Sequence, residues 1–183
     1  MDRDLLKDRK TMPLSMYQAS VPVLLRGLGV LSTLLEKGAA HAAASGIDPA
    51  ELVQARLAPD MLTLAGQVQR ASDTSKFAAA RLSGLPAPSF PDEEASVDDL
   101  LQRVAATVEF LQSVPAEAFE GSEGRSITYG PQSRPTTLPG ADYLLGFALP
   151  NFYFHVTTAY DILRHLGAPI GKRDYLGPLG TKG

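Results

Sequence analysis

Apolar residues recur at every third or fourth position in four long stretches of the chain, the spacing of one face of an α-helix. The first stretch begins after Ser15, which forms a capping-box pattern with Gln18 three residues later. It ends in an alanine-rich run before Gly46. The second stretch runs from about Asp60 to Leu82. Each of these stretches predicts one long helix with a single buried face.

Two further helices follow along the chain. Ser96 is suited to cap the third helix, which Pro115 ends. The last helix spans about Ala141 to Leu166. Pro150 lies inside it and is expected to kink it, because proline removes one hydrogen bond of the helical ladder.

Shorter elements fill the remaining sequence. Asp48 is a favourable N-cap for a short helix, and "RSITYG" with "RPTTL" predicts a small β-hairpin between Pro115 and Gly140. The acidic run at 92–94 lies in a proline-rich loop and is expected to be solvated. The sequence therefore predicts an all-α four-helix bundle with a short extra helix and a small β-hairpin before the last helix. One domain is expected over residues 12–177, with disordered tails at 1–11 and 178–183.

The composition of the chain excludes several classes of function. The chain has 183 residues, a net charge of −3 and no cysteine, so disulfides, thiol nucleophiles and cysteine-bound zinc are excluded. A mildly acidic chain lacks the basic surface that nucleic-acid binding requires. The charged N-terminal residues do not form a secretory signal, and we expect a cytoplasmic protein. Tyr143–Tyr160 is the only segment that approaches a membrane span, but its polar residues favour a central bundle helix over membrane insertion.

Three polar residues interrupt the apolar face of the last helix. Asn151 and His155 are one turn apart, and Thr158 follows on the same face. A buried imidazole or carboxamide without a partner costs about 1–3 kcal/mol. Two interpretations remain open: a core histidine that forms a hydrogen bond across the bundle, or a pocket that holds a ligand or a metal.

A complete metal site is difficult to assemble from this sequence. Zinc requires three or four nitrogen, sulfur or oxygen ligands, and neither His41 nor His165 is expected to lie near His155. On the second helix, Gln67 and Asp73 lie off or beside the inward stripe, and Asp73 is the best placed carboxylate.

Three long segments of the chain resemble a known family: "LSMYQASVPVLLRGLGVLSTLLEKG", "RLAPDMLTLAGQVQRASDTSKFAAARLSG" and "GADYLLGFALPNFYFHVTTAYDILRHLGAPIGKRDYLG". They are similar to an uncharacterised bacterial domain-of-unknown-function family within the DinB-like (DinB/YfiT) superfamily of four-helix bundles. The resemblance covers nearly the whole chain from Met12 to Gly177. It implies a bundle with a long crossover and a homodimer.

The same resemblance implies a divalent metal site, with zinc or nickel as the metal. Its ligands are one histidine on the second helix and an H-x-x-x-H pair on the last. His155 matches the second histidine of that pair, and Asn151 stands in the first position. Gln67 or Asp73 lies near the position on the second helix. Two of the three histidines are therefore replaced, and His155 is the one remaining candidate metal ligand.

Two functions follow from these observations. In the first, the protein is a homodimeric small-ligand-binding or structural protein with a degenerate metal site. Its candidate ligand-binding residues are Asn151, His155, Thr158, Gln67 and Asp73. In the alternative, it is a metal-dependent enzyme of the transferase or hydrolase type that uses a modified site around His155.

Overall fold

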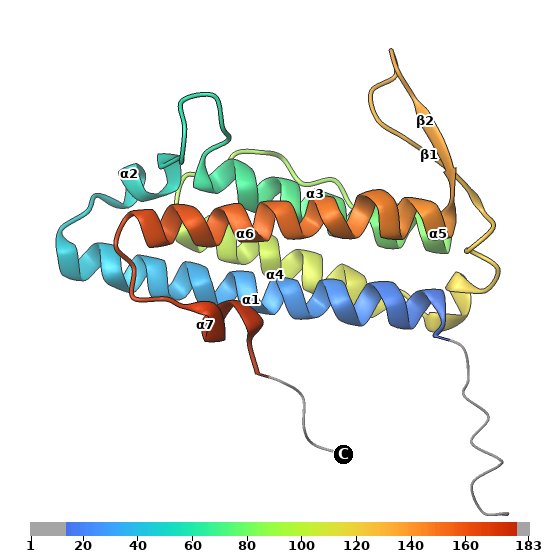
Figure 1. Ribbon diagram of the computed structural model, residues 1–183, viewed down its shortest axis with the longest axis horizontal. Coiled ribbons are helices and arrows are strands. Elements are labelled where there is room, and N and C mark those ends of the chain that lie inside the picture. Colours follow the sequence, from blue (N-terminus) through green and yellow to red (C-terminus); the bar gives the residue numbers. More distant parts are fainter. Residues whose placement is uncertain (1–13, 179–183) are drawn as a thin grey trace, which may run out of the picture.

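The computed structural model describes residues 14–178 and contains four long helices packed side by side (Figure 1). The long helices are α1 (Met16–Ser45), α3 (Leu64–Ser83), α4 (Val97–Ser113) and α6 (Leu149–His165). The shorter elements are α2 (Pro49–Gln54), η1 (Ala116–Phe119), β1 (Ser126–Tyr129), β2 (Thr136–Pro139), α5 (Gly140–Tyr143), η2 (Leu144–Ala148) and α7 (Lys172–Leu176). The predicted bundle, with its short extra helix and hairpin, is confirmed. The tails predicted to be disordered lie outside the described residues, apart from Pro178.

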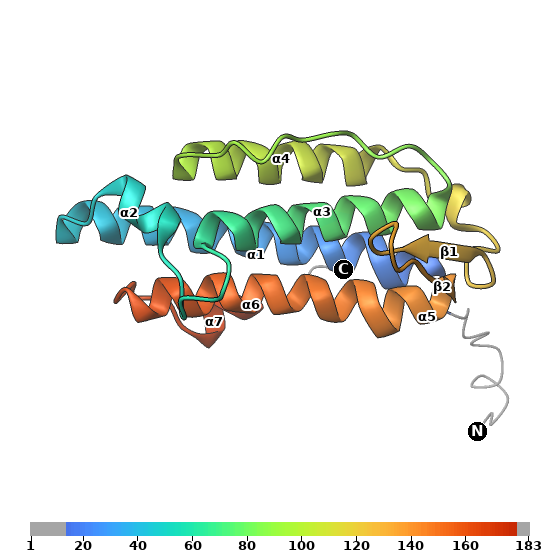
Figure 2. The same cartoon turned by 90° about the horizontal axis from the view of Figure 1, so that it is seen from above.

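The bundle contains a long crossover connection. The helices α1 and α6 run in one direction, and α3 and α4 run in the other (Figures 1 and 2). The segment 84–96 travels back along the bundle, so that α4 starts at the same end as α3. Three prolines in this segment prevent it from forming a helix of its own. The crossover leaves α3 packed between α4 and α6.

Two glycines of α1 allow α6 to approach closely. A Cβ atom at Gly27 would lie 2.3 Å from the ring of Phe152, and one at Gly38 would lie 2.6 Å from Leu163. Glycine costs about 1 kcal/mol in a helix interior relative to alanine. Here that cost is offset because the Phe152 and Leu163 side chains of α6 occupy the space next to the glycines and are almost completely buried there.

The helix ends follow from their capping residues. Ser15 and Gln18 form the predicted capping box, and Gly46 ends α1 in the left-handed conformation. The prediction that the second long helix starts at Asp60 is wrong, because α3 begins at Leu64. The Thr63 hydroxyl caps it by accepting a hydrogen bond from the Gly66 N–H at 3.1 Å.

The last helix is irregular next to its proline. The expected helix over 141–166 begins as α5, widens into the π-helical turn η2 and continues as α6. Within η2, the Leu149 N–H donates to the Leu144 carbonyl, five residues back. The next residue is Pro150, which has no N–H to donate. A single π-helical turn therefore precedes Pro150, and the kink that the sequence predicts stays a prediction.

The hairpin and the C-terminal segment lie on the outside of the bundle. β1 pairs antiparallel with β2, and the Tyr129 ring packs 4.3 Å from the Phe147 ring, centre to centre. The short helix α7, which the sequence did not predict, packs against α1. Its N-terminus is capped by the Asp174 carboxylate, which accepts from the Gly171 N–H at 2.7 Å.

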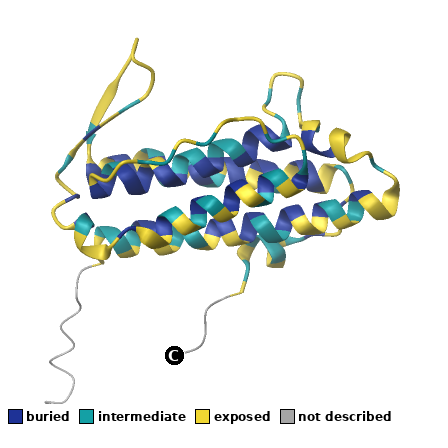
Figure 3. Ribbon diagram, turned by 180° about the vertical axis from the view of Figure 1, so that it is seen from behind, coloured by how far each residue is buried: buried dark blue, intermediate teal, exposed yellow. Residues whose placement is uncertain are grey.

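Buried residues lie on all four long helices, on the faces that meet inside the bundle (Figure 3). One helix, α1, is long and apolar enough to cross a membrane by length and composition. The prediction that Tyr143–Tyr160 is the only such segment is therefore wrong. Half of the qualifying part of α1 is buried within the structure, as expected for the core helix of a bundle.

Candidate functional site

Polar side chains join α3 to α6 in the interior of their interface. The Nδ1 atom of His155 lies 2.8 Å from Oε1 of Gln67, and these two residues are 9% and 1% exposed. The placement of Gln67 off or beside the inward stripe is therefore wrong, because its carboxamide is buried. We use the name α3–α6 seam for Gln67, Thr74, Asn151 and His155.

The hydrogen bonds of Gln67 fix the proton on the imidazole. Its Nε2 donates to the Leu62 carbonyl at 3.3 Å, and a carbonyl can only accept. The Oε1 atom of Gln67 therefore faces His155, so Nδ1 of the imidazole must carry the proton and donate it. Nε2 is left with a free lone pair. It does not belong to the fully buried side-chain atoms that lack a hydrogen-bond partner. The ring presents Nε2 at its exposed edge as an acceptor.

The surroundings of His155 favour the neutral ring. Burial lowers the pKa of His155 from its ordinary value of 6.5 to about 4, and the nearby positive charge of Arg70 acts in the same direction. No acidic group is among the causes of the shift. At neutral pH the imidazole is therefore uncharged, and it can accept a hydrogen bond through Nε2.

Asn151 has its own partner on α3. Its Nδ2 donates to the Thr74 hydroxyl at 2.8 Å, and Thr74 donates in turn to the Arg70 carbonyl at 2.7 Å. Thr158 does not take part, because its hydroxyl donates to the Phe154 carbonyl of its own helix at 2.8 Å. The structure therefore places Asn151 and His155 of α6 opposite hydrogen-bond partners on α3.

Asp73 points to the other side of α3. Its carboxylate lies 2.9 Å from both the Arg103 guanidinium of α4 and the Lys76 ammonium. It also lies 3.3 Å from Arg70. The structure therefore does not bring Asp73 together with His155, and three cations already compensate its charge.

The acidic loop joins the same network of charges. Glu94 lies 2.7 Å from Arg103 and accepts a hydrogen bond from Gln69 at 2.8 Å, and Asp92 pairs with Arg70 and Arg103. The prediction that residues 92–94 are merely solvated is wrong for Glu94, whose side chain is 10% exposed, whereas Asp92 is both exposed and paired. Burial raises the pKa of Glu94, but hydrogen bonds from Arg103 and Gln69 outweigh it and lower the pKa overall. This network attaches the crossover segment to α3 and α4.

Comparison with known proteins identifies the family. A family model described as a domain of unknown function, DUF1993, matches residues 16–176. The chain belongs to the DUF1993 family. The crystal structure of a DinB family member protein from Shewanella denitrificans matches it with a TM-score of 0.85 at 36% sequence identity. That match covers 91% of this chain and 94% of the Shewanella chain.

The two matches confirm the resemblance to an uncharacterised DinB-like family. No curated protein matches the chain. The description of the DUF1993 family assigns no activity to it. The function of this DUF1993 chain has to be argued from the chemistry of its own residues.

The α3–α6 seam of this DUF1993 chain does not fit a zinc or nickel ion. Among the described residues 14–178, no three histidine or acidic side chains gather as metal ligands. His155 uses Nδ1 to bind Gln67, the other side chains of the seam are a carboxamide and a hydroxyl, and the charged group nearby is the cation of Arg70. Such a set contains one imidazole nitrogen, whereas zinc sites use several nitrogen, sulfur or carboxylate ligands.

The sequence singled out Asn151 and His155 but missed Thr74. A signal for Thr74 was present, because it lies seven residues after Gln67 and therefore two turns along the same helical face. Five surface cavities of 220–440 Å³ lie elsewhere, and neither Asn151 nor His155 lines any of them. The seam is a packed interface whose accessible polar groups are the edge of the His155 imidazole and the half-buried carboxamide of Asn151.

Proposed function

We propose that this DinB-like protein is a homodimeric, cytoplasmic binding or structural protein whose ancestral metal position has become a neutral hydrogen-bonded seam. The observation that carries the proposal is the 2.8 Å hydrogen bond between His155 and Gln67. By the resemblance, Gln67 lies near the position on the second helix where the family's metal site has a histidine, and the hydrogen bond fixes the proton on Nδ1. The chemistry that remains at the seam is hydrogen bonding to a small ligand through Nε2.

The alternative function, a metal-dependent transferase or hydrolase, requires a metal at the same place. A divalent ion there would have one imidazole nitrogen and at most weak carboxamide oxygens as ligands. Asp73 cannot readily supply a carboxylate, because it would have to leave Arg103 and Lys76. The small number of available metal ligands therefore favours the binding or structural function.

Metal analysis of the purified protein tests this proposal. We expect zinc and nickel well below stoichiometric amounts in the wild type. The double variant Gln67→His with Asn151→His restores three imidazoles, and we expect it to bind nickel and to melt at a higher temperature when nickel is added, by mass action. The matched control is Gln69→His with Asn151→His, because Gln69 faces Glu94 instead of the seam.

The outcomes separate the two functions. Near-stoichiometric metal in the wild type that disappears in His155→Ala would establish the enzyme alternative and overturn the proposal. Equal nickel responses of the two double variants would show that the seam does not correspond to a former metal position.

The outer face of the last helix supports the homodimer. Leu145 and Phe154 are 63% and 56% exposed, and the stretch from Tyr143 to Tyr160 contains no charged residue. Exposed apolar side chains in an uncharged stretch are typical of surfaces that bind another protein. A two-fold symmetric contact between two copies of this face would cover Leu145 and Phe154 without burying a charged residue of this stretch.

Light scattering coupled to size-exclusion chromatography tests the dimer. At micromolar concentration we expect twice the monomer mass of 19.5 kDa. The double variant Leu145→Glu with Phe154→Glu is expected to elute as a monomer, because four carboxylates would meet in the symmetric interface. Leu85→Glu, at a 41% exposed leucine outside this face, should leave the dimer intact. A monomeric wild type would refute this part of the proposal.

A further inference from the structure

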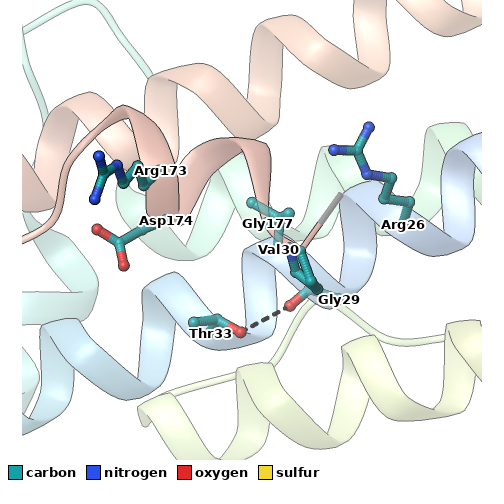
Figure 4. Close-up of a pocket in the computed structure, with 8 residues that line it drawn as sticks. Arg26, Gly29, Val30, Thr33, Arg173, Asp174 and Gly177 are labelled. Carbon is teal, nitrogen blue, oxygen red and sulfur yellow. Dashed lines mark hydrogen bonds between the residues drawn. The ribbon is translucent and has the colours of Figure 1, made fainter. Parts of the chain in front are cut away.

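A cavity of about 440 Å³ lies between α1 and the C-terminal segment around α7 (Figure 4). Its size falls in the range of pockets that hold small organic molecules. The C-terminal segment is attached to α1 by defined contacts: Arg26 donates to the Leu176 carbonyl, and Lys37 pairs with Asp174. Tyr175 adds a hydrogen bond of 2.7 Å to Thr157 on α6. The cavity is therefore bounded by α1 on one side and by an anchored segment on the other.

Gly29 in the wall of this cavity has no packing role inside the chain. It lies in the middle of α1, where glycine is disfavoured relative to alanine. A Cβ atom at Gly27 or Gly38 would collide with α6, but a Cβ atom at Gly29 would meet no atom within 4 Å. Because Gly29 lines the cavity, a side chain at this position would take up space inside it. The glycine keeps the cavity open.

The charges around the cavity favour an anion. Arg26 lies at one side and Arg173 at the other, with Gly29, Val30 and Thr33 of α1 below them (Figure 4). Among the described residues that line the cavity, Asp174 contributes the single carboxylate, and it is paired with Lys37. Both guanidinium groups are well suited to carboxylate or phosphate oxygens.

The wall of the cavity also contains apolar surface. Val30 and Pro178 contribute hydrocarbon to it. A purely inorganic anion would leave this surface without contact, whereas an organic anion would use both the charge and the hydrocarbon. We propose that the cavity between α1 and the C-terminal segment binds a small organic anion, with a carboxylate, phosphate or sulfonate group at an arginine and an apolar body over Val30 and Gly29.

This inference concerns a site separate from the α3–α6 seam and does not depend on the proposed function. Its test uses the full chain and the fluorescent sulfonate 8-anilinonaphthalene-1-sulfonate, which combines an aromatic body with one negative charge. We expect saturable fluorescence enhancement by the folded wild type. Gly29→Leu should weaken binding by about tenfold or more, because the leucine fills the space of the probe.

Stability measurements distinguish loss of the site from loss of the fold. Gly29→Leu should melt at or above the wild-type temperature, because leucine is a better helix former than glycine and meets no neighbour. Gly124→Leu, at another glycine with open space around it, should leave binding unchanged. Arg173→Gln should weaken binding severalfold, and Arg134→Gln on the hairpin loop should not.

Two results would overturn the inference. One is a wild type that does not bind the probe in a saturable manner. The other is a folded Gly29→Leu variant that binds the probe as tightly as the wild type, which would place the probe elsewhere on the surface.

Discussion

Replacing Arg103 with methionine is expected to lower the free energy of unfolding by about 3–5 kcal/mol, the usual cost of removing one partner from a buried ion pair. The Arg103 side chain is 2% exposed and lies within 3.0 Å of Asp73, Asp92 and Glu94. It also donates to the Pro91 carbonyl at 3.0 Å. Methionine retains apolar volume but removes a cation from Asp73 and Glu94, whose side chains are 18% and 10% exposed, and from the more exposed Asp92.

The reason for so large an effect is the position of Arg103 in the chain topology. The crossover segment contains no regular structure, and Arg103 binds three of its groups from the buried side of α4. Loss of the guanidinium therefore releases this segment from the bundle and leaves Glu94 without its cation, while Asp73 and Asp92 keep their pairs with Arg70. Urea denaturation monitored by circular dichroism measures the change. Arg134→Met, at an exposed arginine of the hairpin loop, should change the free energy of unfolding by less than about 0.5 kcal/mol.

Arg103→Lys makes the test more specific. A lysine keeps the charge, but its single ammonium group cannot reach Asp73, Glu94 and the Pro91 carbonyl at the same time, because it lacks the planar fork of a guanidinium. We expect intermediate stability for this variant. A loss below about 1 kcal/mol for Arg103→Met would mean that the network contributes little to stability.

Acidification from pH 7 to pH 4 is expected to destabilise the protein by about 2–3 kcal/mol through His155 alone. Its pKa is about 4 in the folded chain against an ordinary value of 6.5. Between these values the unfolded chain binds a proton at His155 that the folded chain does not, so lowering the pH favours unfolding. The contribution of His155 is fully present above pH 6.5 and is lost progressively as the pH falls toward 4.

Chemical denaturation across this pH range, in the wild type and in His155→Gln, isolates the contribution. The variant cannot be protonated at this position, so its stability should fall less steeply between pH 6.5 and pH 4. His165→Gln, at an exposed histidine, should retain the slope of the wild type. Parallel curves of the free energy of unfolding against pH, for the wild type and His155→Gln, would show that His155 titrates normally in the folded chain.

Most of the fold is predictable from the sequence because its signals are local. Ser15 with Gln18, Asp48 and Ser96 mark helix starts by hydrogen bonds within one turn, and helical periodicity marks the buried faces. The start of α3 and the presence of α7 were not predicted. Both depend on weaker signals: a threonine cap in a loop, and a five-residue helix that is stabilised by its contact with α1.

The candidate site was only partly predictable. Asn151 and His155 stand out because they interrupt an apolar face of the last helix, so their burial follows from periodicity. Their partners lie on another helix, and the rotation of α3 about its own axis decides whether Gln67 or Asp73 faces them. The sequence leaves that rotation open, because the inward stripe of α3 contains small residues that fit several orientations. Packing against both α4 and α6 fixes it, with Asp73 toward Arg103 and Gln67 toward His155.

The central claim is that the His155 imidazole is neutral, carries its proton on Nδ1 and donates it to Gln67. Long-range proton–nitrogen NMR correlations of the histidine side chains, recorded with and without added zinc between pH 5 and pH 8, test it most directly. We expect one unchanging signal set for His155, with the proton on Nδ1 throughout and no response to zinc. A ring protonated on Nε2, a titration near pH 6.5, or a shift on addition of equimolar zinc would contradict it.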